Sequence, residues 1–256
     1  MTTGIEHGRR QALAAAEAGE IPVVMSGDGL IGQIGGALAG GALPMGILPG
    51  GRGNDLARVL GIPKEISGAM DVLAAHAVRS IDVGVVNDRL FLGIASCGFD
   101  SDANRIANEA KLIKGNLVYL YAALKALMQW KPARFTVIAD GTPREFSGYM
   151  VAVANSKAYG GGMFVAPDAE LDDGLLEIVT TSHVGKLRFL VSLPKVFKGA
   201  HVANEEVTVS RAAEVEVRAD RPFAVYADGD HLADLPATVS LRPRALRVIA
   251  PPATTA

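Results

Sequence analysis

The chain of 256 residues has one cysteine, few aromatic residues (5%) and almost no net charge, because 25 basic residues stand against 27 acidic ones. A single cysteine cannot form an internal disulfide, and no Cys/His spacing resembles a zinc site, which is typical of a protein from a reducing cytosol. We expect Cys97 to be a buried core thiol. A net charge of −2 gives no broad attraction for DNA or RNA, so we expect no nucleic-acid partner.

Signals for export or membrane insertion are also missing. No basic and then apolar segment opens the chain, and no run of about 20 uncharged apolar residues could span a bilayer. Hydrophobic residues make up 49% of the chain, so disorder is expected at most in the tail 251–256. We expect a cytoplasmic protein, at most peripheral at the inner membrane surface.

Hydrophobic periodicity changes near residue 80 and divides the chain into two predicted lobes. The first lobe, 1–79, alternates helices and strands, which is typical of a parallel sheet covered by helices. Residues 5–19 are Ala-rich and end at a glycine, as a helix does. The other expected elements are strands at 21–25 and 44–48, a helix from 31 to about 39 and a helix from near 54.

The second predicted lobe, 80–242, is rich in strands. Its residues alternate between apolar and polar over short runs that are bounded by turn residues. Helical stretches are expected at 102–129 and 185–198. The expected strands are 80–86, 89–96, 133–140, 147–155, 175–181, 206–212, 214–219, 223–228, 237–243 and 245–251.

Only two clear strands lie in the first lobe, and a two-stranded parallel sheet cannot bury its faces alone. Two explanations stay open. The C-terminal segment 243–256, with its strand 245–251, could return to complete the first lobe. Alternatively, a strand and a helix could precede the sequence as given.

Each of the first two strands runs into a turn of glycine and aspartate, VVMSGDGLIG at 23–32 and ILPGGRGNDLAR at 47–58. Backbone N–H groups in a glycine turn that opens a helix can approach an anionic ligand, because no Cβ obstructs them. A carboxylate there would repel a phosphate, so we expect Asp28 and Asp55 to act through Mg²⁺ held against phosphate oxygens. The alternative is a pair of ordinary turns, in which Gly and Asp are common.

These strings resemble the GGDGT and PxGTxND motifs of the diacylglycerol kinase catalytic domain, as found in bacterial lipid kinases. Three further stretches follow in the order that this family uses: ASCGFDSDANRIAN from Ala95, YGGGMFVAPDAELDDGLLEI from Tyr159 and YADGDHLADLP from Tyr226. The resemblance covers essentially the whole chain. It implies a NAD kinase-like α/β nucleotide-binding lobe followed by a β-sandwich lobe, with ATP as co-substrate and Mg²⁺ as cofactor.

The resemblance also implies roles for individual residues. Asp28 would organise the catalytic Mg²⁺, and Asp230, the last acid of a DGD string that matches the family's DGE motif, would be the general base for the lipid hydroxyl. Aspartate is one methylene shorter than glutamate, so whether Asp230 can reach the lipid hydroxyl is left open. The implied ATP-binding residues are Thr3, Ser26, Gly27, Asp28, Gly29, Leu30, Arg52, Gly53, Asn54 and Asp55.

Some positions depart from the family pattern. Ser26 replaces the first glycine of GGDGT and Leu30 replaces its threonine, which removes a hydroxyl. Arg52 could contact a phosphate or be a solvated turn residue. Family members open with a strand and a glycine-containing loop that line the nucleotide site, whereas the sequence as given begins near Thr3. We therefore expect weak ATP binding that an upstream extension would restore.

The string ELDDG at 170–174 matches a structural metal loop of the family. There Asp173 would be the side-chain ligand, and carbonyls near Glu170 and Leu175 would complete an oxygen shell. A hairpin turn between strands would use the same residues.

The segment 110–135 combines apolar and aromatic residues with lysines. Such a helix could lie on an anionic membrane or line an acyl-chain pocket, or it could simply present a core face. The residues concerned are Leu112, Leu117, Tyr121, Leu124, Leu127, Met128 and Trp130, with Lys111, Lys114, Lys125 and Lys131.

The sequence thus predicts a lipid kinase that transfers the γ-phosphate of ATP to a membrane lipid, with diacylglycerol and phosphatidate as the first choice of substrate and product. A sphingoid base, ceramide or another lipid alcohol stays an alternative substrate. NAD kinase shares the glycine-aspartate-glycine turn but not the later motifs. A nucleotide- or lipid-binding protein without catalysis is the alternative from another class, and a homodimer is left open.

Overall fold

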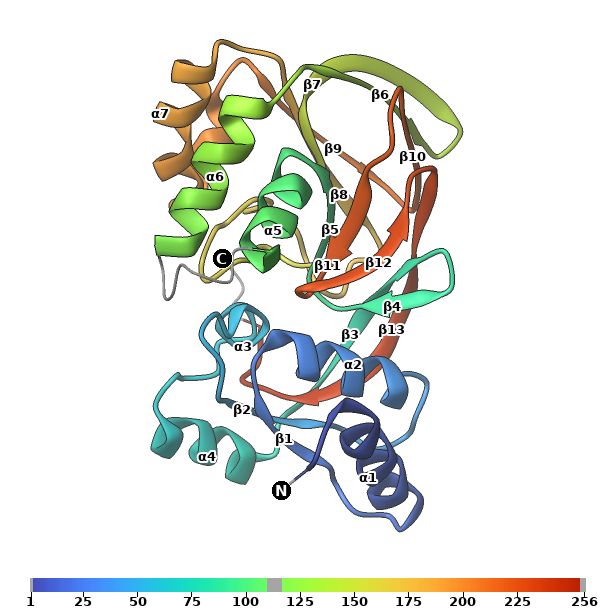
Figure 1. The fold of residues 1–256 in the computed structure, drawn as a ribbon. Helices are drawn as coiled ribbons and strands as arrows, with labels where there is room; N and C mark the ends of the chain where they lie inside the picture. Colours follow the sequence, from blue (N-terminus) through green and yellow to red (C-terminus); the bar gives the residue numbers. More distant parts are fainter. Residues whose placement is uncertain (1, 110–116, 254–256) are drawn as a thin grey trace.

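Two lobes make up the chain in the computed structural model, which describes residues 2–109 and 117–253 (Figure 1). The lower lobe in this view contains a short parallel sheet with helices, and the upper lobe contains a large antiparallel sheet with helices on its outer side. The predicted fold class, an α/β lobe followed by a β-rich lobe, is confirmed. Within the described ranges, no helix has the length and apolar character needed to cross a membrane.

The lower lobe is built around β1 and β2, which pair in parallel from Val23 opposite Gly46 to Ser26 opposite Pro49. A parallel bridge between Met45 and Val248 adds the end of β13 to this sheet. The elements of the lobe are α1 (Ile5–Glu17), β1 (Val23–Ser26), α2 (Asp28–Leu38), β2 (Gly46–Pro49), α3 (Asp55–Val59) and α4 (Ile66–Ala75).

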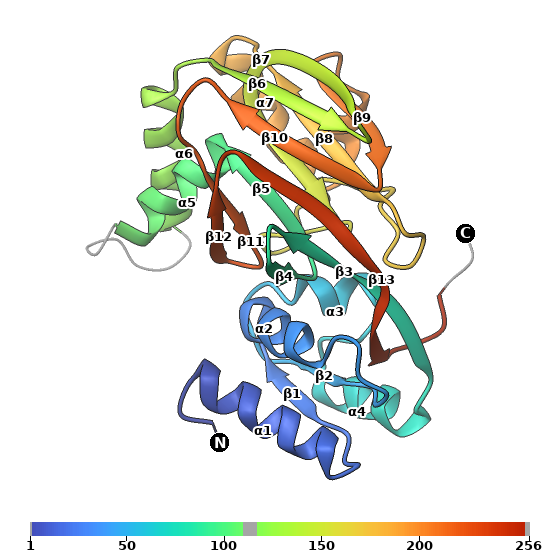
Figure 2. The same ribbon diagram turned by 90° about the vertical axis from the view of Figure 1, so that its right-hand side faces the viewer.

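Fully buried side chains from both ends of the chain form the core of the lower lobe. Ile31 and Ile47 pack in one cluster with Ile81, Leu246 and Val248. Residues beyond 80 therefore help to bury the short sheet, as its small size requires. Figure 2 shows β3 and β13 passing from one lobe into the other, and domain limits near residues 79 and 243 stay a prediction.

The upper lobe is one eleven-stranded sheet in which neighbouring strands are antiparallel, in the order β12-β11-β5-β7-β6-β10-β13-β3-β4, with β8 and β9 attached through β7. Arg89 on β4 donates to the carbonyl of His231 on β12 at 2.8 Å, which brings the two ends of this order together. The elements are β3 (Val78–Val86), β4 (Arg89–Phe91), β5 (Ile94–Gly98), α5 (Phe99–Glu109), α6 (Leu117–Gln129), β6 (Ala133–Ala139), β7 (Thr142–Ala154), β8 (Leu176–Ser182), α7 (Lys186–Val196), η1 (Ala200–Ala203), β9 (Val207–Ala212), β10 (Glu214–Ala219), β11 (Ala224–Ala227), β12 (Asp230–Asp234) and β13 (Ala237–Ile249).

Aromatic side chains attach the helices to the upper sheet. Trp130, at the end of α6, stacks on Tyr149 of β7 with ring centroids 5.8 Å apart, and Phe189 of α7 stacks on the same tyrosine at 4.0 Å. Such pairs add to the free energy gained from burial. Cys97 is buried beside this core, and burial raises the pKa of its thiol, so the prediction of a core cysteine is confirmed.

The strand predicted at 89–96 is two strands in the structure, β4 and β5. It breaks at Leu92 and Gly93, whose N–H groups donate to the carboxylate of Asp228 instead of a neighbouring strand. The carbonyl of Gly93 accepts the N–H groups of Asn155 and Ser156. A contact with a residue far along the chain therefore decided the break, and periodicity alone could not indicate it.

The strands predicted at 237–243 and 245–251 are one strand, β13, with an irregularity between Arg242 and Leu246. Arg244 lies there with a φ of 49°, and its N–H donates to Asp82 at 2.6 Å. The helical stretch predicted at 102–129 contains α5 and α6, and its residues 110–116 lie outside the described ranges.

Asp82 is a buried carboxylate whose two oxygens accept the N–H groups of Arg244 and Gly174. Replacing it with alanine removes the partner of both amides and leaves a gap at a fully buried position. We expect Asp82→Ala to lower the free energy of unfolding by about 3 kcal/mol, measured by urea denaturation. Asp88→Ala, at an exposed turn, is the control and should change it by less than about 0.5 kcal/mol. Equal effects would show that Asp82 is dispensable for folding.

Candidate active site

The two glycine loops that follow β1 and β2 touch each other. A Cβ added to Gly51 would overlap Cα of Gly27, and a Cβ added to Gly27 would lie 3.1 Å from Cα of Gly51. Only glycine at both positions allows this approach. The repeated pattern of strand and glycine turn therefore produces two loops packed against each other at the carboxyl ends of two parallel strands.

Asn54 closes the second loop on itself. Its Oδ1 accepts the N–H of Gly51 at 2.8 Å, and its Nδ2 donates to the carbonyl of the same residue at 2.9 Å. Its backbone is left-handed, with a φ of 53°, a conformation in which asparagine is enriched among non-glycine residues. The side chain is buried and fully used in this way, so Asn54 shapes the loop.

Asp28 and Asp55 approach each other across Gly53, whose Cβ, if present, would lie 2.9 Å from Oδ2 of Asp28 and 3.0 Å from Oδ2 of Asp55. Their partners differ. Asp55 pairs with Arg58 at 2.6 Å and accepts the N–H of Gly161 at 2.7 Å. Asp28 accepts the N–H of Leu56 at 3.1 Å and has no ion pair among the residues described. Asp28 is therefore the carboxylate that is open to a cation.

The DGD turn of the upper lobe lies along the first two turns of α2. Oδ2 of Asp228 accepts the N–H of Leu92 at 2.7 Å, and Oδ1 accepts that of Gly93 at 2.9 Å. A Cβ at Gly32 of α2 would lie 2.7 Å from Oδ2 of Asp228, and one at Gly29 would lie 3.2 Å from its carbonyl. The absence of side chains on this face of α2 lets the two lobes meet.

Asp230 faces the same helix. Its Oδ2 accepts a hydrogen bond from Nε2 of Gln33 at 2.9 Å, between residues 197 positions apart. Asp28 and Gln33 belong to α2, whereas Asp230 opens β12. The structure thus brings together, at the junction of the lobes, the two residues for which the sequence predicts catalytic roles.

Clustering of acids changes the electrostatics of this junction. Burial raises the pKa of Asp28 above its ordinary value, and the negative charge of Asp55 adds to that rise. Burial also raises the pKa of Asp228 to about 6, with smaller contributions from Asp28 and Asp230. Each shift indicates that a negative charge is costly at this junction, mainly because the carboxylates are buried. The donor set, carboxylates beside free helix N–H groups, suits Mg²⁺ carried by a phosphate.

Other residues predicted to bind ATP either make contacts within the lower lobe or are exposed to solvent. The side chain of Leu30 packs toward Gly8 of α1, so it fills the space between two helices. Thr3 forms hydrogen bonds to His7 at 3.1 Å and to no other residue in the described ranges. Ser26 ends β1, and its carbonyl accepts the N–H of Gly50. Arg52 is exposed and forms no ion pair with any described residue. Their contacts with ATP stay predictions.

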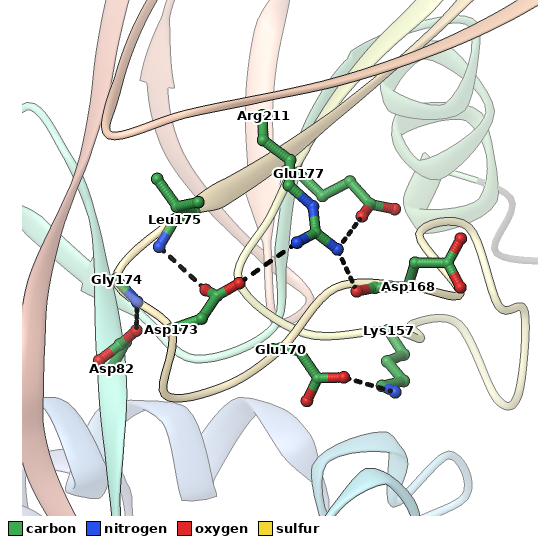
Figure 3. Close-up of polar contacts among 9 residues, drawn as sticks. All are labelled: Asp82, Lys157, Asp168, Glu170, Asp173, Gly174, Leu175, Glu177 and Arg211. Atoms are coloured by element: carbon green, nitrogen blue, oxygen red, sulfur yellow. Dashed lines mark hydrogen bonds and ion pairs between the residues drawn. The ribbon is translucent and has the colours of Figure 1, made fainter. Parts of the chain in front are cut away.

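Acidic residues of the predicted metal loop pair with basic side chains from other segments of the upper lobe (Figure 3). Asp173 accepts the N–H of Leu175 at 3.0 Å, and its other oxygen lies 3.5 Å from Arg211. Glu170 pairs with Lys157 at 3.4 Å.

Arg211 also donates to the carbonyl of Asp168 at 2.7 Å and pairs with Glu177 at 3.4 Å. Both oxygens of Asp173 are thus in use, and the described residues contain no cluster of three or more acidic, His or Cys ligands. Asp173 and the carbonyls near Glu170 and Leu175 as metal ligands therefore stay a prediction.

Sequence reasoning missed Gln33, Arg58 and Gly161 as parts of the site. Gln33 follows Gly29 by one helical turn, a spacing that places both on one face of α2 and could have indicated it. Arg58 follows Asp55 by three residues, a spacing typical of helical ion pairs. No local signal indicates Gly161, because its contact with Asp55 joins residues 106 positions apart.

Known proteins resemble this chain in both lobes. Residues 1–86 match the diacylglycerol kinase catalytic domain, and residues 93–250 match the YegS C-terminal NAD kinase beta sandwich-like domain. The chain is 37% identical over 257 residues to a diacylglycerol kinase of Mycobacterium tuberculosis, covering 97% of this chain and 83% of that protein. The chain belongs to the diacylglycerol kinase family. The family predicted from the motifs is therefore confirmed, and membership makes the chain a lipid kinase by family.

Further relatives agree with this membership. A YegS-like lipid kinase of Pseudomonas aeruginosa is 33% identical to this family member over 248 residues, covering 94% of this chain and 79% of the relative. The crystal structure of a diacylglycerol kinase from Bacillus anthracis str. Sterne superposes with a TM-score of 0.76 at 20% identity, covering 99% of this chain and 85% of that one. At that identity the likeness shows the shared fold.

Contact between the two glycine loops can be tested directly. Gly51→Ala should push the loops apart and displace the N-terminus of α2, and we expect the affinity for Mg²⁺-ATP to fall about tenfold or more in calorimetric titration. The control is Gly185→Ala, where an added Cβ meets nothing within 4 Å. Unchanged affinity in a folded Gly51→Ala variant would show that the contact does not shape the nucleotide site.

Proposed function

We propose that this family member transfers the γ-phosphate of ATP to the hydroxyl of diacylglycerol and produces phosphatidate. The observation that carries the proposal is the approach of Asp230, from the upper lobe, to the N-terminal turns of α2, where Asp28 lies. Phosphoryl transfer to an alcohol needs a phosphate site, a cation and a base close together. The names of the relatives, diacylglycerol kinase and YegS-like lipid kinase, support a lipid as acceptor.

The nucleotide phosphates would lie against the first turn of α2. Its N-cap is Gly27, and the first N–H groups of a helix have no partner within the helix. Gly27, Asp28 and Gly29 are only partly buried, so a phosphate could approach this turn from its exposed side. When bound, Mg²⁺ would neutralise charge on the phosphate oxygens, and Asp28 is the residue that would hold it. Asp55 would support the loop through Arg58, since that ion pair uses its charge.

The acceptor hydroxyl would lie beside Asp230. Oδ2 of that residue takes the hydrogen bond from Gln33, which fixes the orientation of the carboxylate and leaves Oδ1 to accept the proton of the lipid alcohol. The contact of Asp230 with α2 supports a position close enough to offset the shorter reach of aspartate. Asp228 holds the turn that carries it.

Two alternatives stay open within this proposal. A sphingoid base, ceramide or another lipid alcohol presents a similar primary hydroxyl, so a panel of lipids with labelled ATP decides the acceptor. Leu30 packs between helices where the family motif has threonine, which favours the second alternative, a nucleotide- or lipid-binding protein without catalysis. Absence of transfer to every lipid, together with measurable ATP binding, would favour that alternative. Peripheral membrane contact is a further expectation of the proposal, and a homodimer is left open.

Replacing Asp28 with asparagine tests the cation. The change removes one negative charge and keeps the shape, so we expect the turnover number to fall by a factor on the order of 10² or more while thermal unfolding stays near that of the parent. The Mg²⁺ concentration for half-maximal rate should rise. Near-normal turnover in the folded variant would remove Asp28 from the mechanism.

Replacing Asp230 tests the base. Asparagine keeps an oxygen for Gln33 but cannot take a proton, so Asp230→Asn should lower the turnover number by a factor on the order of 10² or more with little change in ATP affinity. Asp230→Glu should retain activity. If the asparagine variant turns over at the parent rate, Asp230 is only a turn residue, and if both variants lose ATP binding, its role lies with the nucleotide.

A further inference from the structure

The helices α6 and α7 expose apolar side chains that the core does not use. Leu127 and Trp130 of the α6 segment are buried, as the core interpretation predicted, but Met128 is 79% exposed. On α7, Phe189 is buried while Leu187 is 75% exposed. Met128 and Leu187 are the two most exposed large apolar residues in the part of the chain that the structure describes.

A hydrogen bond joins the C-terminal part of α6 to the start of α7. Nζ of Lys186 donates to the carbonyl of Met128 at 2.8 Å, so the residue before Leu187 is anchored to Met128 itself. Figure 1 shows α6 and α7 next to each other on the outer side of the upper lobe. The exposed set, called the α6–α7 face below, consists of Tyr121, Leu124, Met128, Leu187, Val191 and Phe197.

Basic residues predominate in the segments that form the α6–α7 face. The segments 117–139 and 178–204 contain no aspartate or glutamate. Their basic residues are Lys125, Lys131, Arg134, Lys186, Arg188, Lys195 and Lys198. Arg188 pairs with Glu205 and Glu206, but Lys125 lies over the ring of Tyr121 at 5.7 Å, at the edge of the apolar side chains. The chain as a whole has a net charge of −2, so this local excess of positive charge is not a general property of the surface.

We propose that the α6–α7 face is the surface by which this protein docks on an anionic lipid bilayer. Exposed apolar side chains would enter the acyl boundary, and the lysines around them would remain at the headgroups. Basic residues beside an apolar surface gain attraction from anionic lipids. A second copy of the chain suits this face less well, because a two-fold axis would set lysines against lysines. The proposal rests on the proposed lipid substrate, which it places in a membrane.

Vesicle binding without ATP tests the proposal independently of catalysis. The parent should sediment with vesicles of phosphatidylcholine mixed with phosphatidylglycerol, and much less with phosphatidylcholine alone. The double variant Met128→Glu/Leu187→Glu should bind the mixed vesicles about tenfold more weakly or worse. The matched control is Met70→Glu, an exposed methionine on α4 of the other lobe, which should bind like the parent.

A fluorescence measurement does not depend on the glutamate variants. Trp130 is the only tryptophan of the chain and is buried, so a tryptophan added at the surface reports its own surroundings. Emission of Leu187→Trp should shift to the blue on addition of the mixed vesicles, and emission of Met70→Trp should not. Equal responses from both positions would overturn the proposal.

Activity separates this proposal from the proposed function. The double variant should phosphorylate a dispersed short-chain diacylglycerol at the parent rate and long-chain diacylglycerol in mixed vesicles more slowly. Vesicle binding without any kinase activity would overturn the proposed function and support the docking face. Parent and double variant binding equally, no binding by the parent, or a dimer that only the double variant dissociates would each overturn the docking face.

Discussion

The carboxylate of Asp228 lies where the two lobes meet, and the arrangement of the candidate site depends on its contacts. It takes the N–H groups that interrupt the strand between β4 and β5, and it lies directly against Gly32 of α2. Any side chain at Gly32 would displace the turn, and with it Asp230. The orientation of Asp230 toward the lower lobe therefore depends on one buried acid and one missing Cβ. Burial disfavours the charged form of the Asp228 carboxylate and raises its pKa to about 6, which is an energetic cost of this arrangement.

The two acids that follow β1 and β2, Asp28 and Asp55, have different partners at the junction of the lobes. Asp55 is buried and has its own cation in Arg58, so it contributes to the shape of the loop with little net charge. Asp28, which has no such partner among the described residues, keeps a charge that a bound cation can use. Two aspartates at equivalent positions after two parallel strands thus have different chemical roles, because an arginine lies three residues after only one of them.

The lobes share their long strands, and this connects the junction to the rest of the molecule. β3 and β13 run through both lobes, and Asp82, a buried residue of β3, accepts N–H groups from the irregular point of β13 and from the loop at Gly174. Asn155 links the carbonyls of Asp82 and Leu92. Hydrogen bonds through Leu92, Asn155 and Asp82 therefore form a continuous path from Asp228 to that loop.

Sequence patterns within a few residues were sufficient to predict part of the fold and the region of the candidate site. Alternation of strands and helices, the change of period near residue 80 and the two glycine turns indicate the fold class and the region of the site, because they depend on φ/ψ preferences and side-chain spacing within a few residues. The family motifs added Asp28 and Asp230. The contact between Gln33 and Asp230, the break at Leu92, the continuity of β13 and the Arg211 contacts around Asp173 were not predictable in this way. Each joins residues far apart in the chain, and hydrogen bonding and desolvation are decided by which groups the fold brings together, which only the tertiary structure determines.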